Sequence, residues 1–141
     1  MPSDDEIAIR AAVSQWFDVL NAMLNGDAEP LAALYSHGDD VTYMGAEGTY
    51  RVGWSDTFAD WKAQAEKSTG GTVEGRDIHV VVSGDMATAT HYTIGNVRTS
   101  DSQEAETSVR ETSVFRKEDG AWRMIGHHAD TIPNWAKAFG N

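Results

Sequence analysis

The hydrophobic period of the chain changes once, near Gly70 and Gly71, and this change limits the folds that the chain can adopt. Before the two glycines, apolar residues recur at intervals of three and four, as on one face of an α-helix. After them, apolar and polar residues alternate, which is typical of strands. Helices followed by antiparallel strands indicate an α+β fold. We therefore expect a curved, conical, mostly antiparallel sheet wrapped around three N-terminal helices.

The expected helices are bounded by recognisable end signals. The first, over residues 3–26, opens with a capping box of Ser3 and Glu6 and ends at Gly26. Its apolar stripe consists of Ile9, Val13, Trp16, Phe17, Leu20 and Leu24. A short second helix is expected over residues 27–36 with Asp27 as its cap, and a third starts at Trp54 and ends at the Thr-Gly-Gly sequence 69–71. Strands are expected over residues 39–50, 75–99 and 107–131, the last two ranges each folding back at a tight turn.

Composition excludes several classes of function. The chain has 141 residues, which fits a single domain over residues 1–141, and it carries a net charge of −11 and no cysteine. The charge disfavours nucleic acid and anionic membranes as partners, and no apolar run approaches the ~20 residues of a membrane span. Because nucleotide-binding loops and thiolate ligands are lacking, we expect no cofactor. The acidic start differs from a signal peptide, so a cytoplasmic location is expected.

Four local sequences, taken in their order, indicate a family. They are "VTYMGAEGTYRVGWSDTFADW", "SGDMATAT", "ETSVFRKEDGAW" and "WRMIGHHAD". Together they resemble the SnoaL-like branch of the nuclear transport factor 2-like superfamily. The resemblance implies a conical α+β barrel, frequent dimers, and a pocket that serves isomerases, polyketide cyclases, dehydratases, epoxide hydrolases and non-catalytic binders. Fold alone does not choose among these functions.

The resemblance also has departures. Relatives that resemble the association domain of calcium/calmodulin-dependent kinase II tend to place arginines in the pocket. The matching positions here are Thr93, Ser113 and Ala129, so an anion-binding pocket of that type is not expected. The catalytic sets of ketosteroid isomerase and of limonene-type epoxide hydrolases are not recognisable in the sequence.

Strand alternation predicts which side chains line the interior. If the small residues Ala87 and Ala89 face the helices, His91 and Thr93 share their face. On the last hairpin, the inward candidates are Glu111, Ser113, Phe115, Arg123, Ile125 and His127. His127 and His128 are adjacent and must point to opposite faces. We expect His127 to face inward, although a single bulge would exchange it for His128, which matches a closing histidine of the family.

These inward polar residues support two interpretations. In the first, His127 or Glu111 acts as a base, and Tyr43 or His91 donates a proton to a developing oxyanion. In the second, His91, Glu111 and His127 form a satisfied structural network, or Glu111 pairs at the surface with Arg110 or Arg98. No metal is expected, because the histidines lack the spacing of a metal motif.

The aromatic residues predict that a bound ligand is apolar. Residues that could line a ligand pocket are Trp16, Tyr35, Trp54, Phe58 and Trp61, together with Thr93 and Ser113. Their helical spacing is equally typical of a core. The function expected is therefore an acid–base enzyme, a cyclase, isomerase or dehydratase, acting on a small apolar carbonyl compound. The alternative is a non-catalytic ligand-binding or association domain.

We also expect a homodimer. The strands carry apolar and β-branched residues on both faces, so one face can close the pocket while the other needs cover. The C-terminal sequence "NWAKAFGN" places Trp135 and Phe139 four residues apart. A short amphipathic turn there would cap the pocket mouth or join the dimer interface, and a frayed end is the alternative.

Overall fold

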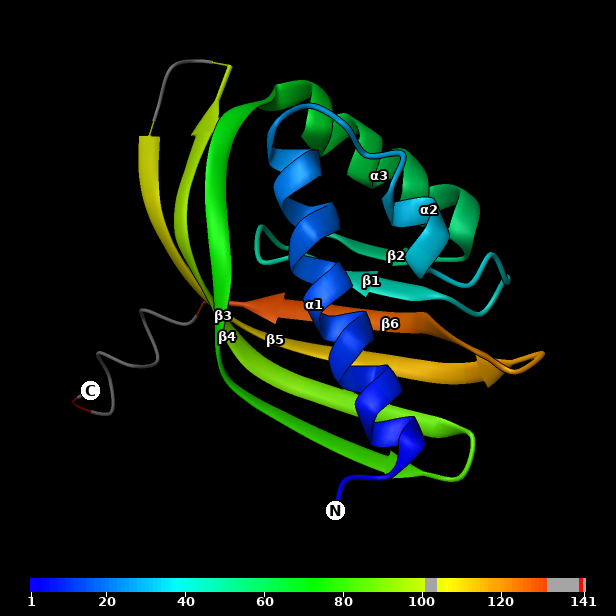
Figure 1. Ribbon diagram of the computed structural model, residues 1–141. Coiled ribbons are helices and arrows are strands. Elements are labelled where there is room, and N and C mark those ends of the chain that lie inside the picture. Colours follow the sequence, from blue (N-terminus) through cyan, green and yellow to red (C-terminus); the bar gives the residue numbers. More distant parts are fainter. Residues whose placement is uncertain (101–103, 132–139, 141) are drawn as a thin grey trace.

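The computed structural model describes residues 1–100, 104–131 and 140. Its helices are α1 (Asp4–Leu24), α2 (Leu31–Leu34) and α3 (Trp54–Lys67). Its strands are β1 (Thr42–Met44), β2 (Tyr50–Val52), β3 (Ser68–Ser83), β4 (Met86–Thr99), β5 (Glu104–Glu118) and β6 (Ala121–Asp130). The strands form a single curved, unclosed sheet against which the helices pack, and this arrangement confirms the expected α+β class (Figure 1).

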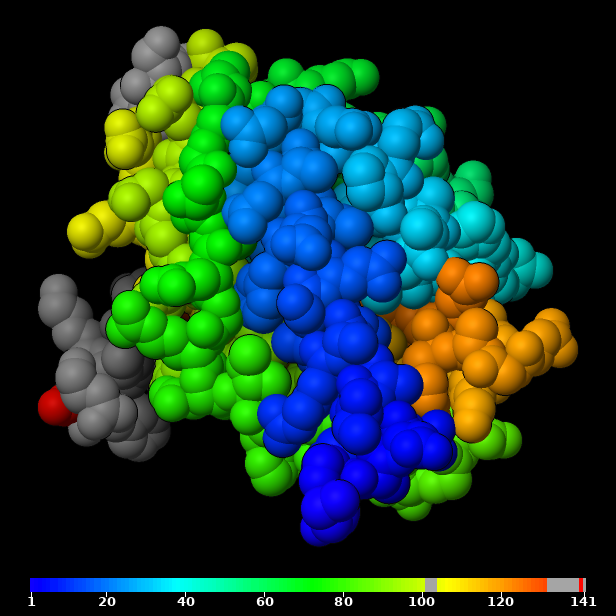
Figure 2. Space-filling view, in the orientation of Figure 1, coloured from blue at the N-terminus to red at the C-terminus, as the bar shows by residue number. Residues whose placement is uncertain are grey.

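Helix α1 lies across the concave face of the sheet (Figure 1). The Ser3 hydroxyl accepts a hydrogen bond from the Glu6 amide, and the helix gives way to Asn25 and to Gly26 at a φ of 98°. Its stripe is buried, with Ile9, Val13 and Trp16 no more than 2% exposed. The side chains of α1 fill the space between β3 and the α2 region (Figure 2). Apolar burial along this stripe thus fixes the helix on the sheet.

The sheet has the strand order β2-β1-β6-β5-β4-β3. Neighbouring strands are antiparallel except β1 and β6, which run parallel. Two local features accompany the curvature of the sheet. The register of β3 and β4 shifts between Arg76 and His79, and Gly71 and Gly95 take positive φ where a Cβ atom would meet the opposite backbone. Bulges and glycines of this kind let a strand bend.

Two element boundaries differ from the expectation. Asp27 does not cap α2, because Pro30 is its N-cap and the Asp27 carboxylate accepts from the Glu29 amide instead. The sequence 69–71 lies inside β3 rather than at the end of α3, because its glycines adopt extended, positive-φ conformations. The C-terminal turn containing Trp135 and Phe139 lies outside the described residues. Within the ranges that are described, no helix is long and apolar enough to cross a membrane.

Candidate functional site

A bulge in β6 decides which histidine faces the interior. Phe115 pairs with Met124 and Val114 pairs with Gly126, so Ile125 has no partner of its own. His127 then lies opposite Ser113 and is 3% exposed, whereas His128 is on the exposed face.

Without this bulge, the turn would carry His128 to the inner face. The expectation for His127 therefore holds, but the inward placement of Arg123 and Ile125 is wrong. Met124, fully buried, takes that position.

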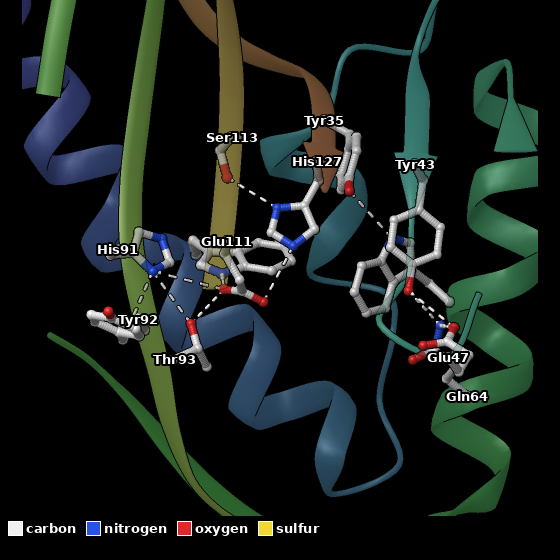
Figure 3. A network of polar contacts seen from close by, with 12 residues as sticks. Tyr35, Tyr43, Glu47, Gln64, His91, Tyr92, Thr93, Glu111, Ser113 and His127 are labelled. Atoms are coloured by element: carbon white, nitrogen blue, oxygen red, sulfur yellow. Dashed lines mark hydrogen bonds and ion pairs between the residues drawn. The ribbon is translucent and has the colours of Figure 1, made fainter. Parts of the chain in front are cut away.

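The carboxylate of Glu111 is the centre of a buried polar network (Figure 3). Its Oε1 accepts hydrogen bonds from Trp16 Nε1 at 3.2 Å and from the Thr93 hydroxyl. Its Oε2 lies 3.3 Å from His127 Nε2, and His91 Nδ1 is 3.8 Å from Oε1. The residues come from α1, β4, β5 and β6, and each is at most 6% exposed. Here the structure brings together His91, Glu111 and His127.

The Glu111 carboxylate is held in its ionised form. Burial on its own raises the pKa of Glu111, but attraction to His127 and hydrogen bonds from His127 and Thr93 outweigh it, with a further contribution from His91. The net result is a pKa below the usual range of a glutamic acid. The alternative pairing with Arg110 does not occur, because that guanidinium binds both oxygens of Asp130 at 2.9 Å.

The His127 imidazole is enclosed by polar and aromatic partners. Ser113 Oγ lies 3.0 Å from its Nδ1, opposite the nitrogen that meets Glu111. The ring centroid is 4.3 Å from that of Trp16, 6.3 Å from Tyr43 and 6.4 Å from Trp61. Trp16 and Trp61 also contact each other edge to face at 5.7 Å. Aromatic rings thus form the wall beside the network.

The His91 imidazole differs from that of His127. Its Nδ1 lies 3.3 Å from both the Tyr92 carbonyl oxygen and the Thr93 hydroxyl. Its Nε2 is buried and has no hydrogen-bond partner among the described residues. Burial lowers the pKa of His91, although the nearby Glu111 charge opposes this. The ring is therefore neutral at pH 7.

The two tyrosines do not direct their hydroxyl groups to Glu111 (Figure 3). Tyr43 accepts a hydrogen bond from Gln64 Nε2 at 2.8 Å and donates toward Glu47 at 3.5 Å. Tyr35 accepts from Trp61 Nε1 at 3.3 Å. Burial raises the pKa of both phenols. The expected donor role of Tyr43 thus has no geometric support. Strand alternation did not predict Gln64 and Glu47 as the partners of its hydroxyl group.

The remaining aromatic candidates lie in a separate stack. Trp54 stacks on Phe58 at 4.8 Å and on His37 at 4.6 Å, and Tyr35 contacts Trp54 at 5.3 Å. Trp54 and Phe58 are only partly buried. They therefore support the outer side of the core rather than the wall around His127. Across the described ranges, no group of three His, Asp or Glu residues is placed to hold a metal ion.

Comparison with known proteins places the chain in a family. A family model described as a SnoaL-like domain matches residues 9–133. The chain belongs to this SnoaL-like family. No curated protein sequence matches it.

Solved structures give the same fold at low identity. A nuclear transport factor 2-like superfamily protein from Salmonella enterica is 16% identical, with a TM-score of 0.78 and coverage of 89% of this chain and 91% of that one. A candidate dehydratase from Streptomyces avermitilis is 20% identical (TM-score 0.78; coverage 93% and 99%). The association domain of CaMKII from C. elegans is 16% identical (TM-score 0.67; coverage 92% and 100%).

In this SnoaL-like domain, the wall around Glu111 carries no arginine at the three positions singled out in the sequence. Thr93 and Ser113 contribute hydroxyl groups, and Ala129 contributes a methyl group. Glu111 is therefore balanced by hydrogen-bond donors and by the two imidazoles rather than by a fixed positive charge. A carboxylate this close to an imidazole stabilises the positive charge that the ring acquires when it takes up a proton.

Proposed function

We propose that the protein is a cofactor-independent acid–base enzyme, a cyclase, isomerase or dehydratase, that acts on a small, largely apolar carbonyl compound. The observation that carries this proposal is the buried contact of one carboxylate, that of Glu111, with the two imidazoles of His91 and His127. An imidazole that takes a proton from a ligand becomes positive, and a carboxylate at this distance stabilises that charge.

The surroundings support an apolar substrate. The rings of Trp16, Tyr43 and Trp61 pack around His127, and aromatic surroundings of this kind favour flat, weakly polar molecules. An anionic substrate would meet the negative charge of Glu111 without a compensating cation. Membership of the SnoaL-like family and the likeness to a candidate dehydratase agree with proton-transfer chemistry.

Proton abstraction can be tested without the natural substrate. Cyclohexanone and acetophenone are incubated with the protein in D₂O, and NMR follows the exchange of their α-hydrogens for deuterium. We expect the wild type to accelerate exchange. Glu111→Gln should lower this rate by about 10²-fold, because the charge that stabilises the imidazolium is lost. His127→Gln should lower it as well, because it removes the His127 Nε2 contact with the Glu111 carboxylate.

His128→Gln is the matched control, because His128 follows His127 on β6 but lies on the exposed face. It should keep the wild-type rate. Circular dichroism checks that each variant is folded. Exchange that is unaffected by Glu111→Gln and His127→Gln, or a wild type no faster than buffer, would contradict the proposal.

A second candidate function is association through the outer face of the sheet. Val81, Met86 and Tyr92 are 50%, 42% and 45% exposed there. Large apolar side chains gathered on one face favour contact with another protein surface. We propose a second copy of the chain as the partner, because a symmetric pair covers the same face on both copies.

A further inference from the structure

One nitrogen of the buried network stands apart. The Glu111 carboxylate oxygens and both nitrogens of His127 have partners, whereas His91 Nε2 has none among the described residues. The His91 side chain is only 1% exposed, so bulk water does not replace the missing partner. A buried polar atom without a hydrogen bond destabilises the folded state, and such an atom in a native protein calls for an explanation.

The contacts of the other ring nitrogen define the state of Nε2. The Tyr92 carbonyl oxygen near Nδ1 can only accept a hydrogen bond. The Thr93 hydroxyl hydrogen is directed to Glu111, so its oxygen is also an acceptor toward Nδ1. The Glu111 carboxylate, 3.8 Å away, attracts a proton to the same nitrogen. The hydrogen of neutral His91 therefore resides on Nδ1, which leaves a lone pair on Nε2.

His127 differs, because both of its ring nitrogens have partners. Its Nε2 lies 3.3 Å from the Glu111 carboxylate, and its Nδ1 lies 3.0 Å from the Ser113 hydroxyl. Neither nitrogen of His127 is open to a ligand. Of the two imidazoles, only His91 thus offers an unoccupied acceptor.

We infer that His91 Nε2 is the atom that meets the substrate, and that the substrate is an uncharged molecule presenting a hydroxyl or an acidic C–H group to it. The inference rests on the proposed function for the position of the site, and it assigns to His91 the role of base. An anion would be repelled by Glu111. A cation would gain little from that carboxylate, because three donors already satisfy it.

The proposed proton transfer involves only the substrate, His91 and Glu111. The hydrogen of the substrate O–H or α-C–H moves to His91 Nε2, and the electron pair of the broken bond stays on the substrate as an alkoxide or enolate. The imidazolium formed is stabilised by Glu111 near its Nδ1. In the second half of the reaction the imidazolium returns a proton to the substrate, and in D₂O a deuteron taken up from solvent takes its place, so no oxidant or further reactant is needed.

A matched pair of small probes tests this assignment. Phenol and anisole share a ring, but the methyl group of anisole replaces the hydroxyl hydrogen. Binding at millimolar concentration is followed by NMR titration of the protein, with ¹⁵N detection of the histidine rings. We expect neutral His91 protonated on Nδ1, a shift of its Nε2 resonance with phenol only, and at least tenfold tighter binding of phenol, about 1.4 kcal/mol.

His91→Phe removes the acceptor and keeps a ring, so the preference for phenol should fall below about twofold, the scale of a lost hydrogen bond. His79→Phe is the control, because His79 is exposed on the adjacent strand. A hydrogen on Nε2, equal binding of the two probes, no binding of phenol, or a preference that survives in His91→Phe overturns the inference.

The two proposals fail separately. If Glu111→Gln abolishes exchange while the phenol preference survives His91→Phe, the enzyme proposal stands and the assignment to His91 fails. If His91→Phe abolishes the preference but the wild type catalyses no exchange, the ligand contact stands and the enzyme proposal fails.

Discussion

At the residue scale, the Glu111 network makes the free energy of unfolding depend on pH. The pKa of His91 is lowered from 6.5 and that of Glu111 from 4.5 in the folded state. Each group binds its proton more readily when the chain is unfolded, so both contribute stability above their unfolded pKa values. That stability is lost as the pH falls, first below about 6.5 and then below about 4.5.

Urea unfolding between about pH 8 and about pH 4, a range that includes the unfolded pKa values of both groups, measures this dependence. Each group contributes a slope of at most about 1.4 kcal/mol per pH unit. His91→Phe should flatten the curve near pH 6, whereas His128→Phe, on the exposed face, should leave it unchanged. A wild-type protein that gains stability on acidification from pH 7 to pH 5 would contradict this prediction.

The residues of the site were predictable only as far as strand alternation reaches. His91 and Thr93 follow from Ala87 and Ala89 because β4 is regular over that range. His127 depends on the bulge at Ile125, which nothing in the local sequence marks. Alternation also cannot show which partner the polar end of a long side chain contacts. The ring of Tyr43, for example, approaches His127, while its hydroxyl group contacts Gln64.

At the scale of elements, the curvature of β3 and β4 depends on glycine. Gly95 has a φ of 155°, and a Cβ atom there would lie 2.0 Å from the Thr72 carbonyl oxygen of the opposite strand. Gly95→Ala should therefore lower the free energy of unfolding by about 3 kcal/mol, through backbone strain and overpacking. Urea denaturation measures the change.

Gly84→Ala provides the comparison for this variant. Gly84 has a φ of 60° in the turn between β3 and β4, and a Cβ atom there has nothing within 4 Å. The same substitution should lower stability there by only about 1 kcal/mol, the strain of a left-handed alanine. Equal losses in the two variants would mean that the close approach at Gly95 does not constrain the sheet.

The order of elements was predictable, whereas some pairings were not. The change from helical to alternating period locates the boundary between α3 and β3 to within a few residues, since β3 begins at Ser68. Gly70 and Gly71 resemble a helix stop, but positive φ serves equally well in a bent strand. The parallel contact of β1 with β6 joins segments about 80 residues apart, and only tertiary packing selects it.

At the scale of the whole molecule, the sheet has two unequal faces. The concave face is covered by α1, while the outer face exposes Val81, Met86 and Tyr92 to solvent. Large apolar side chains exposed on one face of the described sheet are typical of an association surface. The polar residues among these side chains, such as the paired Arg110 and Asp130, suit the rim of an interface rather than its centre.

Dimerisation through this face predicts a species of twice 15.4 kDa in light scattering at micromolar concentration. Tyr92→Lys should shift the protein to 15.4 kDa, because the new charge lies beside Arg76 and Arg110, its partners on the neighbouring strands, and must be desolvated when the face is covered. Ile7→Lys introduces the same charge at a side chain that is 54% exposed on α1, away from the sheet, and should leave the dimer intact. A wild type with only the 15.4 kDa species, or dissociation by both variants alike, would remove the outer face as the site of association.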